Sequence, residues 1–391
     1  MFERLIAPTL QSLSQSFKII VLTGPRQSGK TTLLRHLFPD YHYVSLESPD
    51  ILLFVQQDPR GFLQSYSGHW IIDEAQNFPG LFSYLQELID TPQEKRRFIL
   101  SGSQNFLLAE HISQTLAGRA AILELLPLSY AEYLSSPNQP ELSLWEFLFQ
   151  GGYPRPYYEH LPLNIWYDSY IRTYLERDVR SLIHIKDLAK FQLFLRLCAG
   201  RHGQLLNMSE LANASGLSHT TISHWLSILE ASYIVFRLQP YHKNFNKRLV
   251  KTPKLYFYDS AIVCRLLQIE SAEHLQMHAS RGAIFEGFVL GEIIKSTLAK
   301  GQRPYLYFWR DHLGMEIDAI IEQGQYLQAV EIKSANTITP DYFKSLQQWK
   351  KIVGENHVHR YLVYAGDNAS NRNDIQILPW NEIGSGLMNY K

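Results

Sequence analysis

The sequence predicts an α/β protein whose N-terminal third holds a largely parallel sheet. Two observations predict this fold class. Between residues 17 and 125, short apolar runs of strand length alternate with amphipathic stretches of helical periodicity. From residue 129 to about 199 the strand signal disappears, and segments rich in Leu, Tyr, Glu and Arg replace it. Because strands that alternate with helices pack as a parallel sheet covered by helices, we expect a sheet domain followed by a helical region.

The expected strands of the sheet are apolar runs with β-branched or aromatic residues, which favour extended structure. They are KIIVLTG, YHYVSLE, HWIIDE, RFILSGS and AAILELL. Residues 31–37 and 81–88, between these runs, carry helical periodicity.

Composition excludes several classes of protein. The chain has 391 residues, too many for one ordinary core, and it is 45% hydrophobic and 19% charged, as globular domains are. Lys+Arg and Asp+Glu both number 37, so any basic surface for nucleic acid must be local. Cys198 and Cys264 lie far apart in apolar surroundings, which favours reduced, buried thiols. With neither signal-peptide anatomy nor an apolar run of ~20 residues, we expect a cytoplasmic protein without a membrane partner.

A phosphate-binding loop follows the first apolar run. GPRQSGKT matches G-x-x-x-x-G-K-[ST] and opens a helical segment at Thr31. The glycines allow successive N–H groups to surround a β-phosphate, and the helix N-terminus adds positive partial charge. We expect Lys30 to bridge the β- and γ-phosphates and the Thr31 hydroxyl to bind Mg²⁺. The alternative is a glycine-rich turn before a helix. The nucleotide-binding residues predicted here are Gly24, Pro25, Arg26, Gln27, Ser28, Gly29, Lys30, Thr31 and Thr32.

A pair of acids ends the apolar run HWIIDE, which we expect to stop beside the loop strand. Asp73 would hold Mg²⁺ through water, and Glu74 would act as general base on the attacking water. The alternative is a strand end capped by solvated acids.

Two further candidates for catalysis follow along the chain. Ser103, with Ser101 and Gln104 as close alternatives, ends the run FILSGSQ, where a polar group can bond the attacking water or the γ-phosphate. A plain strand-to-turn transition is the competing interpretation. Arg119 precedes the last run, where an arginine can reach the γ-phosphate of a neighbouring subunit. A surface salt bridge is the alternative for Arg119.

Together, GPRQSGKTT, WIIDEAQ, LSGS and LAGR resemble the AAA+-type ATPase module of a large prokaryotic family of uncharacterised ATP-binding proteins. In that family a domain of unknown function follows, and YLERDVR and GGYP resemble its hallmarks. The resemblance spans nearly the whole chain. It implies ATP rather than GTP, and it places Asp73 on the metal-binding acid, Glu74 on the presumed base and Arg119 on the candidate arginine finger.

A helix-turn-helix is predicted over residues 205–230. Gly216 supplies the turn, and Ile222, Trp225, Leu226 and Leu229 recur at helical spacing. The second helix would expose short polar side chains suited to phosphates and base edges. These are Ser218, His219, Thr220, Thr221, Ser223 and His224.

A basic stretch over residues 241–254 follows, with aromatic residues and no acid, and completes the pattern of a winged helix with a basic wing. Its basic residues are Lys243, Lys247, Arg248, Lys251 and Lys254, and its aromatic residues are Tyr241 and Phe245. The alternative is that the helices only pack against the ATPase lid or mediate protein contacts, and that the basic stretch is a solvated edge.

A candidate nuclease site lies in the last third. Glu286 falls in a helical segment, Asp318 in the run EIDAII, and Glu331-Ile332-Lys333 ends the run YLQAVEIK, with a hairpin at Gly324. Acid, strand and acid-x-Lys resemble a restriction-endonuclease-like core. There Asp318 and Glu331 would bind Mg²⁺, Lys333 would orient or activate water, and Glu286 would support them. Ordinary surface ion pairing, or a nuclease fold that has lost activity, is the alternative.

The sequence therefore predicts four segments. They are an AAA+-type P-loop ATPase core over 1–128, a helical lid or bridge over 129–200, a winged-helix-like segment over 201–275 and a restriction-endonuclease-like domain over 276–391. The predicted function is Mg²⁺-dependent ATP hydrolysis coupled to DNA binding, with metal-dependent DNA cleavage as an extension. The alternative is a nucleotide-controlled switch or scaffold that contacts proteins, its nuclease-like domain inactive. We expect ATP, Mg²⁺ and DNA as partners, and a homo-oligomer.

Overall fold

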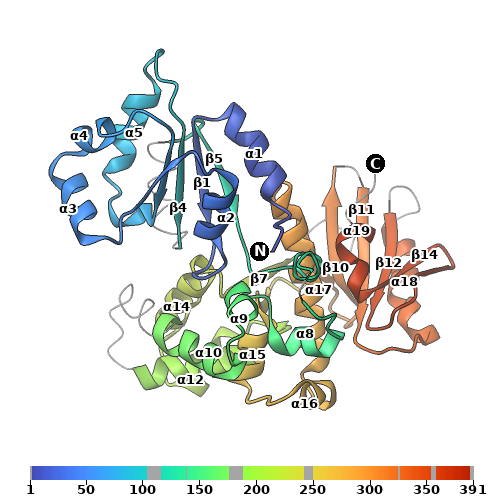
Figure 1. Ribbon diagram of the computed structural model, residues 1–391. Coiled ribbons are helices and arrows are strands. Elements are labelled where there is room, and N and C mark those ends of the chain that lie inside the picture. Colours follow the sequence, from blue (N-terminus) through green and yellow to red (C-terminus); the bar gives the residue numbers. More distant parts are fainter. Residues whose placement is uncertain are drawn as a thin grey trace. The chain divides into compact units, whose positions relative to one another are not determined.

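The computed structural model describes residues 2–103, 116–137, 139–175, 188–241, 250–324, 326–353 and 358–387. The chain divides into two compact units (Figure 1). Unit 1 comprises Met1–Leu128, Ala231–Tyr233 and Leu298–Gln302. Unit 2 comprises Ser129–Glu230, Ile234–Thr297 and Arg303–Lys391.

Unit 1 is built on a parallel sheet of the order β2-β3-β4-β1-β5, which confirms the predicted α/β fold. Its strands are β1 (Ile19–Thr23), β2 (His42–Ser45), β3 (Trp70–Asp73), β4 (Phe98–Gly102) and β5 (Ala120–Glu124). The expectation that the Asp73 strand stops directly beside the loop strand is wrong. Strand β4 pairs with both β1 and β3 and so lies between them.

Helices cover both faces of this sheet because its strands are apolar on both sides. Ile19 and Val21 of β1 pack in a core with α3, α4 and α5, whereas Ile20 and Leu22 pack with α1 and α2 (Figure 1). The helices of unit 1 are α1 (Ala7–Ser16), α2 (Lys30–Leu37), α3 (Pro49–Gln57), α4 (Pro59–Gln64) and α5 (Leu81–Ile89), with the 3₁₀ helix η1 (Ala75–Asn77).

Unit 2 begins with helices. They are α7 (Tyr130–Leu134), α8 (Leu144–Gln150), α9 (Pro154–Tyr158), α10 (Leu163–Tyr170) and the π-helix η2 (Ile171–Leu175). The GGYP segment has a structural role here. Gly151 has φ +74, and a Cβ there would lie 2.1 Å from the Tyr167 hydroxyl oxygen. The N–H of Gly152 donates to Asp259 at 2.7 Å, which ties the segment to the start of α15 (Ser260–Leu266). Of the YLERDVR segment, residues 176–180 lie outside the described residues.

Residues 188–257 include the predicted helix-turn-helix and belong to unit 2, except for Ala231–Tyr233. The elements are α12 (Leu188–Gly200), β6 (Gln204–Leu205), α13 (Met208–Ser215), α14 (His219–Ala231), β7 (Val235–Pro240) and β8 (Lys254–Phe257). Gly216 ends α13 with φ +64, a left-handed angle that glycine adopts without strain. Trp225 of α14 packs edge-on against Phe191 and Phe194 of α12, which orients the two helices.

The rest of unit 2 is an α/β segment. Its helices are α16 (Ala272–Met277), α17 (Arg281–Ala299), α18 (Lys344–Val353) and α19 (Ile383–Gly386), with 3₁₀ helices η3 (Pro340–Phe343) and η4 (Trp380–Glu382). Its strands are β9 (Leu306–Arg310), β10 (Glu316–Gln323), β11 (Tyr326–Lys333), β12 (Val358–Tyr364), β13 (Ser370–Arg372) and β14 (Ile375–Pro379). Strands β10 and β11 form the predicted antiparallel hairpin, with Gly324 at φ +61.

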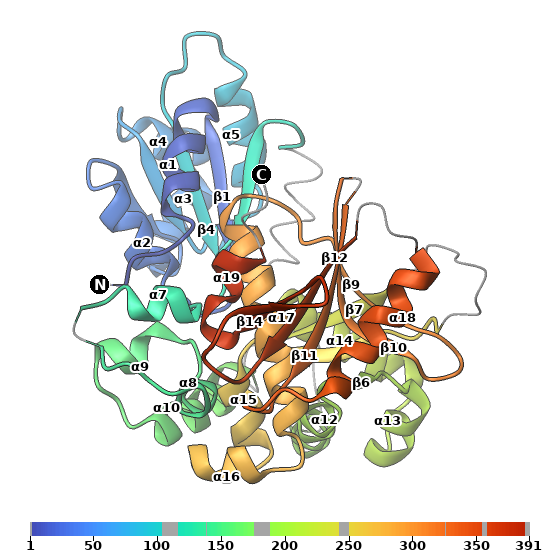
Figure 2. The ribbon, with the colours of Figure 1, turned by 90° about the vertical axis from the view of Figure 1, so that its right-hand side faces the viewer.

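One sheet runs through unit 2 in the order β13-β14-β12-β11-β10-β9-β7-β8-β6. Strand β7 pairs with β9, so the strands around the helix-turn-helix and those of the last third share this sheet. Ile317 of β10 packs with Trp349 of α18. Because side chains alternate along a strand, Glu316 and Asp318 point to the opposite face, where α17 lies (Figure 2).

Candidate functional site

The phosphate-binding loop leaves β1 at Gly24, where only glycine fits. Gly24 has φ +147, and a Cβ there would lie 2.1 Å from the carbonyl oxygen of Leu125. Gly29 has φ +93 and precedes the first residue of α2, Lys30. The loop therefore ends at a helix N-terminus, whose free N–H groups attract anions.

Lys30 is directed into the loop. Its ammonium donates to the carbonyl oxygens of Gly24 at 2.8 Å and Pro25 at 2.9 Å. Burial lowers the pKa of Lys30 to about 8, against the opposing charges of Glu74 and Asp73. With a pKa of about 8, the ammonium group is mostly protonated at neutral pH. A phosphate in place of the two carbonyl oxygens would balance its positive charge.

Asp73 gathers hydroxyl groups at the end of β3. Its Oδ2 accepts from the Thr31 hydroxyl at 2.6 Å and the Tyr43 hydroxyl at 3.0 Å, and its Oδ1 accepts from the Ser101 hydroxyl at 2.5 Å. The contact between Thr31 and Asp73 joins the start of α2 to the end of β3. A hydroxyl and a carboxylate oxygen side by side are ligands that suit Mg²⁺, so these residues fit the metal that the loop motif implies.

Glu74 is held in an unusual conformation beside Asp73. Its backbone is left-handed, with φ +51 and ψ +44, which costs a residue other than glycine conformational energy. Its carboxylate accepts from the Gln76 side-chain amide and from the Ser103 hydroxyl at 3.2 Å. The structure thus brings Glu74 and Ser103 together, whereas Ser101 contacts Asp73 and Gln104 lies outside the described residues.

Arg119 lies at the opposite end of the parallel strands from the phosphate loop. Ala120 pairs with Ile19, so Arg119 is next to the start of β1, about five residues or ~16 Å of strand from the loop. Its guanidinium makes a bidentate ion pair with Asp90 at 2.8 and 3.0 Å, which raises the pKa of Arg119. This is the surface salt bridge that was the alternative for Arg119. A contact with a nucleotide would require another subunit and the rupture of this pair.

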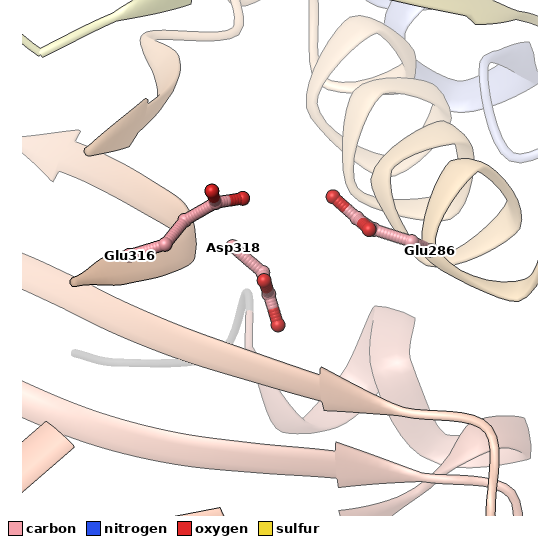
Figure 3. Close-up of side chains that lie close together, drawn as sticks. All are labelled: Glu286, Glu316 and Asp318. Atoms are coloured by element: carbon pink, nitrogen blue, oxygen red, sulfur yellow. The ribbon is translucent and has the colours of Figure 1, made fainter. Parts of the chain in front are cut away.

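A second group of acids lies in unit 2. Carboxylate oxygens of Glu286, Glu316 and Asp318 lie within 4.8 Å of one another (Figure 3). Glu286 comes from α17 and the other two come from β10. Glu331 of β11 stands opposite Asp318 in the hairpin, and the main-chain N–H of Ile332 donates to Asp318 at 2.7 Å. We name Glu286, Glu316, Asp318 and Glu331 the acid cluster.

Two lysines balance part of the charge of the acid cluster. Lys333 pairs with Glu331 at 2.6 Å and with Asp318 at 3.4 Å. Lys254 of β8 pairs with Glu286 at 2.9 Å and with Glu316, and it is 4% exposed. The position of Lys254 in the basic stretch predicted that it belongs to a basic wing for DNA. That prediction is wrong, because the Lys254 side chain is buried and paired with two acids.

Burial governs protonation in the acid cluster. Burial, with the Asp318 charge, raises the pKa of Glu331 to about 8 and that of Glu286 to about 7, against the ammonium groups of Lys333 and Lys254. The Glu331 Oε2 is buried and has no hydrogen-bond partner within the described structure. Burial lowers the pKa of Lys254, but the Glu286 and Glu316 charges outweigh it and raise that pKa.

The surface of α14 matches the predicted polar face. Ser218, His219, Thr220, Ser223 and His224 are exposed and Thr221 is half-buried, whereas Ile222, Trp225, Leu226 and Leu229 are buried. In the basic stretch, Lys251 is exposed. Lys243, Phe245, Lys247 and Arg248 lie outside the described residues.

Known families and proteins match most of the length of the chain. An AAA domain family matches residues 16–134, and two domains of unknown function match residues 141–273 and 281–383. Uncharacterised proteins of Mycobacterium tuberculosis and Mycobacterium bovis are each 33% identical over 355 residues, which cover 90% of this chain and 77% of theirs. The chain belongs to the same family as these proteins, and its residues 16–134 form an AAA domain.

An uncharacterised protein of Haemophilus influenzae is 25% identical to this family member over 277 residues, 61% of this chain and 66% of that protein. The Walker-type ATPase of Pyrococcus abyssi aligns with 68% of this chain and 96% of its own, at 15% identity and a TM-score of 0.41. A structural similarity at that level carries no conclusion about this chain beyond what its own sheet and loop show. In the described part of the chain, no helix is long and apolar enough to cross a membrane.

Several residues at the phosphate loop and at the acid cluster were not assigned to these sites from the sequence. Arg4 donates to the carbonyl oxygens of Ser28 at 2.7 Å and Leu126 at 2.6 Å, and so braces the loop from the N-terminus. Tyr43, Lys254 and Glu316 also reach the sites through tertiary contacts. Glu316, two residues before Asp318 on the same strand face, is the one that period-two alternation could have found.

Proposed function

We propose that the protein binds ATP with Mg²⁺ at residues 24–32 and hydrolyses it. The observation that carries this proposal is the 2.6 Å contact between the Thr31 hydroxyl and Asp73, next to a loop into which Lys30 already points. Thr31 and Asp73 would hold the Mg²⁺, which offsets phosphate charge when bound. Lys30 would bind the β- and γ-phosphate oxygens, and Glu74, oriented by Ser103, would take the proton of the attacking water.

The test is ATP turnover with Mg²⁺ by the full chain. Lys30→Ala should abolish nucleotide binding or turnover, and Glu74→Gln should bind ATP but not hydrolyse it. Lys344→Ala is a matched control, because Lys344 is an exposed lysine paired with Asp341 on the surface of unit 2. Turnover at the wild-type rate by both loop-site variants would contradict the assignment.

DNA is the partner that we propose for unit 2. The support is the order of elements α12, β6, α13, α14, β7 and β8, which is that of a winged helix, together with the exposed hydroxyl and imidazole groups of α14. Because the net charge is +0, attraction to phosphate must come from local groups. Binding of duplex DNA that weakens steeply with salt, and that changes with nucleotide state, is the expected result.

A nucleotide-controlled switch or scaffold that contacts proteins is the second candidate. The observation that favours it is the burial of Lys254, which removes one of the positive charges from the expected DNA surface. ATP-dependent assembly without salt-dependent DNA binding would support this alternative.

Metal-dependent cleavage of DNA is the extension that we propose for the acid cluster. Two observations support this proposal. An acid on α17, an acid on β10 and acid-x-Lys on β11 resemble a restriction-endonuclease-like core, and the Glu331 Oε2 is buried without a hydrogen-bond partner in the described chain. Asp318, Glu331 and Glu286 would hold Mg²⁺, and Lys333 would orient water. Lys333→Ala should abolish Mg²⁺-dependent cleavage of duplex DNA and leave ATP turnover intact. Cleavage at an unchanged rate would remove Lys333 from the mechanism.

A homo-oligomer follows from the same proposals. Arg119 would act on the nucleotide of another subunit, because it lies beside the start of β1, at the opposite end of that strand from the phosphate loop. We expect the rate of ATP turnover per subunit to rise with protein concentration. Arg119→Ala should lower this rate without loss of ATP binding.

A further inference from the structure

A three-residue segment that starts with the last residue of α14 and ends before β7 belongs to unit 1. Ala231–Tyr233 packs with unit 1, whereas Glu230 before it and Ile234 after it belong to unit 2. The chain therefore belongs to unit 1 from the last residue of α14 to Tyr233, and it belongs to unit 2 again from Ile234, one residue before β7. A displacement of this segment is passed on through covalent bonds to both elements.

Tyr233 is the contact of this segment with β1. Its hydroxyl lies 2.7 Å from the Oγ1 of Thr23, in a buried position. The Thr23 hydroxyl also donates to the carbonyl oxygen of Leu123 at 3.3 Å. In the contact between Tyr233 and Thr23, either hydroxyl can be the donor. Thr23 is the last residue of β1, and the next residue is Gly24 of the phosphate loop.

The surroundings hold Tyr233 firmly. Its backbone is left-handed with φ +58, a conformation that a bulky residue adopts only when packing and hydrogen bonds enforce it. The next residue, Ile234, donates its N–H to the carbonyl oxygen of Leu229 at 2.9 Å and so closes the last turn of α14. Strand β7 begins at Val235. The strained angle thus stands between the end of one element and the start of the other.

The loop side of the contact is equally tight. The N–H of Leu125 donates to the Thr23 carbonyl at 2.8 Å, and the Gly24 α-carbon lies against the Leu125 carbonyl oxygen. Any shift of the loop on phosphate binding must therefore act on Thr23 or be absorbed by Gly24. A buried hydrogen bond to Thr23 is placed to register that shift.

We propose that Tyr233 is a positioning residue that links the state of the phosphate loop to α14 and β7. Nucleotide at the loop changes the Thr23 end of β1, the Tyr233 hydroxyl follows, and the end of α14 adjusts with it. This inference rests on the proposed function for ATP binding. It adds the residue through which nucleotide state and DNA affinity would be coupled.

Hydrogen exchange tests this link without DNA. Full-length protein is compared with and without a non-hydrolysable ATP analogue and Mg²⁺, as wild type, as Tyr233→Phe and as Tyr153→Phe. Tyr153 is the matched control because its hydroxyl makes a buried bond to the Tyr170 hydroxyl in unit 2, at 2.9 Å. We expect the analogue to protect residues 24–32 in all three proteins. It should change exchange in residues 229–236 in wild type and Tyr153→Phe but not in Tyr233→Phe.

The outcomes separate the inference from the function beneath it. Protection of residues 24–32 with no change in residues 229–236 of wild type overturns the role of Tyr233 and leaves ATP binding standing. An equal change in Tyr233→Phe and wild type also overturns it. No protection of residues 24–32 in any protein contradicts the proposed ATP site itself.

A DNA-binding measurement gives a second readout. In the Glu74→Gln background, the Kd for labelled duplex DNA should differ about fivefold or more between ATP-bound and nucleotide-free protein, a common size for coupling between sites. Adding Tyr233→Phe should reduce this ratio to less than about twofold, whereas adding Tyr153→Phe should retain it. A full ratio in the Tyr233→Phe protein contradicts the inference.

Discussion

Asp73 in unit 1 and the acid cluster in unit 2 both place carboxylates on or beside β-strands, but their charges are balanced differently. The contacts of Asp73 are the hydroxyls of Thr31, Tyr43 and Ser101 and the N–H of Glu74, all of them neutral groups. In the acid cluster, Glu286, Glu316, Asp318 and Glu331 share the ammonium groups of Lys254 and Lys333. Neutral donors orient a carboxylate without cancelling its charge, whereas ammonium groups cancel it. The hydrogen-bond partners of Asp73 therefore leave its charge in place, whereas two ammonium groups serve as counter-ions in the acid cluster.

The largest effect that follows from this comparison is on ATP turnover. Glu74→Gln keeps the shape of the side chain but removes the base, so turnover should fall by about 10²- to 10⁴-fold while ATP still binds. Single-turnover hydrolysis and equilibrium nucleotide binding measure the two quantities. Asp318→Asn in unit 2 is the matched control and should leave ATP turnover unchanged. Loss of turnover with Asp318→Asn would show that the two acid sites are not independent.

Removal of the Lys254 ammonium group, which pairs with two acids of the acid cluster, should destabilise the fold. Lys254→Met leaves Glu286 and Glu316 buried without their partner, so the free energy of unfolding should fall by about 3 kcal/mol. Denaturant unfolding measures this loss. Lys344→Met, at the exposed pair with Asp341, is the control and should change little.

The same variant tests whether Lys254 occupies the place of a cation. With the ammonium gone, Mn²⁺ can take its position between Glu286, Glu316 and Asp318, so Mn²⁺ should raise the Tm of Lys254→Met by more than that of wild type. Equal shifts in the two proteins would mean that the lysine and the metal do not compete.

The stability of unit 2 should fall as the pH rises. The folded-state pKa of Glu331 is about 8, above its ordinary value of 4.5, so the folded protein binds this proton more tightly than the unfolded chain does. Stability from this proton is complete below pH ~4.5 and is lost as the pH rises to about 8, by up to about 1.4 kcal/mol per pH unit. Glu331→Gln should flatten the profile of unfolding free energy between these values. If Glu331→Gln left the slope of this profile unchanged, the pH dependence of stability would come from another group.

The smallest effect is expected at the exposed ion pair of unit 1. Arg119 and Asp90 are 38% and 48% exposed, so water and salt screen their attraction. Arg119→Ala should leave the Tm within experimental error, in contrast to Lys254→Met. A large fall in Tm would show that surface pairing at this edge of the sheet matters more than its exposure implies.

Local pattern was sufficient for much of unit 1. Phosphate-loop residues are contiguous, the apolar runs have strand length, and the helix begins at Lys30, within the predicted motif. The position of β4 between β1 and β3 was missed because strand order depends on which faces pack together, and neighbouring runs in sequence do not reveal it. The pairings of Ser101 with Asp73 and of Ser103 with Glu74 follow from that order.

Unit 2 was less accessible to the same reasoning. The β10–β11 hairpin and the helix-turn-helix were predicted because their signals lie within about thirty residues of each other. Lys254 was assigned to a DNA-facing wing because five basic residues occur close together in the sequence. Its partner Glu286 lies 32 positions away, and only the packing of α17 on the sheet brings the two together.

The sequence by itself determined the phosphate loop, the acids at the end of β3 and the polar face of α14, because each depends on backbone preference and side-chain period within one short segment. Only the tertiary structure decided which charges neutralise which, and where the chain of unit 2 enters unit 1 at Tyr233. Electrostatic energy and buried hydrogen bonds depend on distance in space and on exclusion of water, and both quantities arise only when distant segments pack.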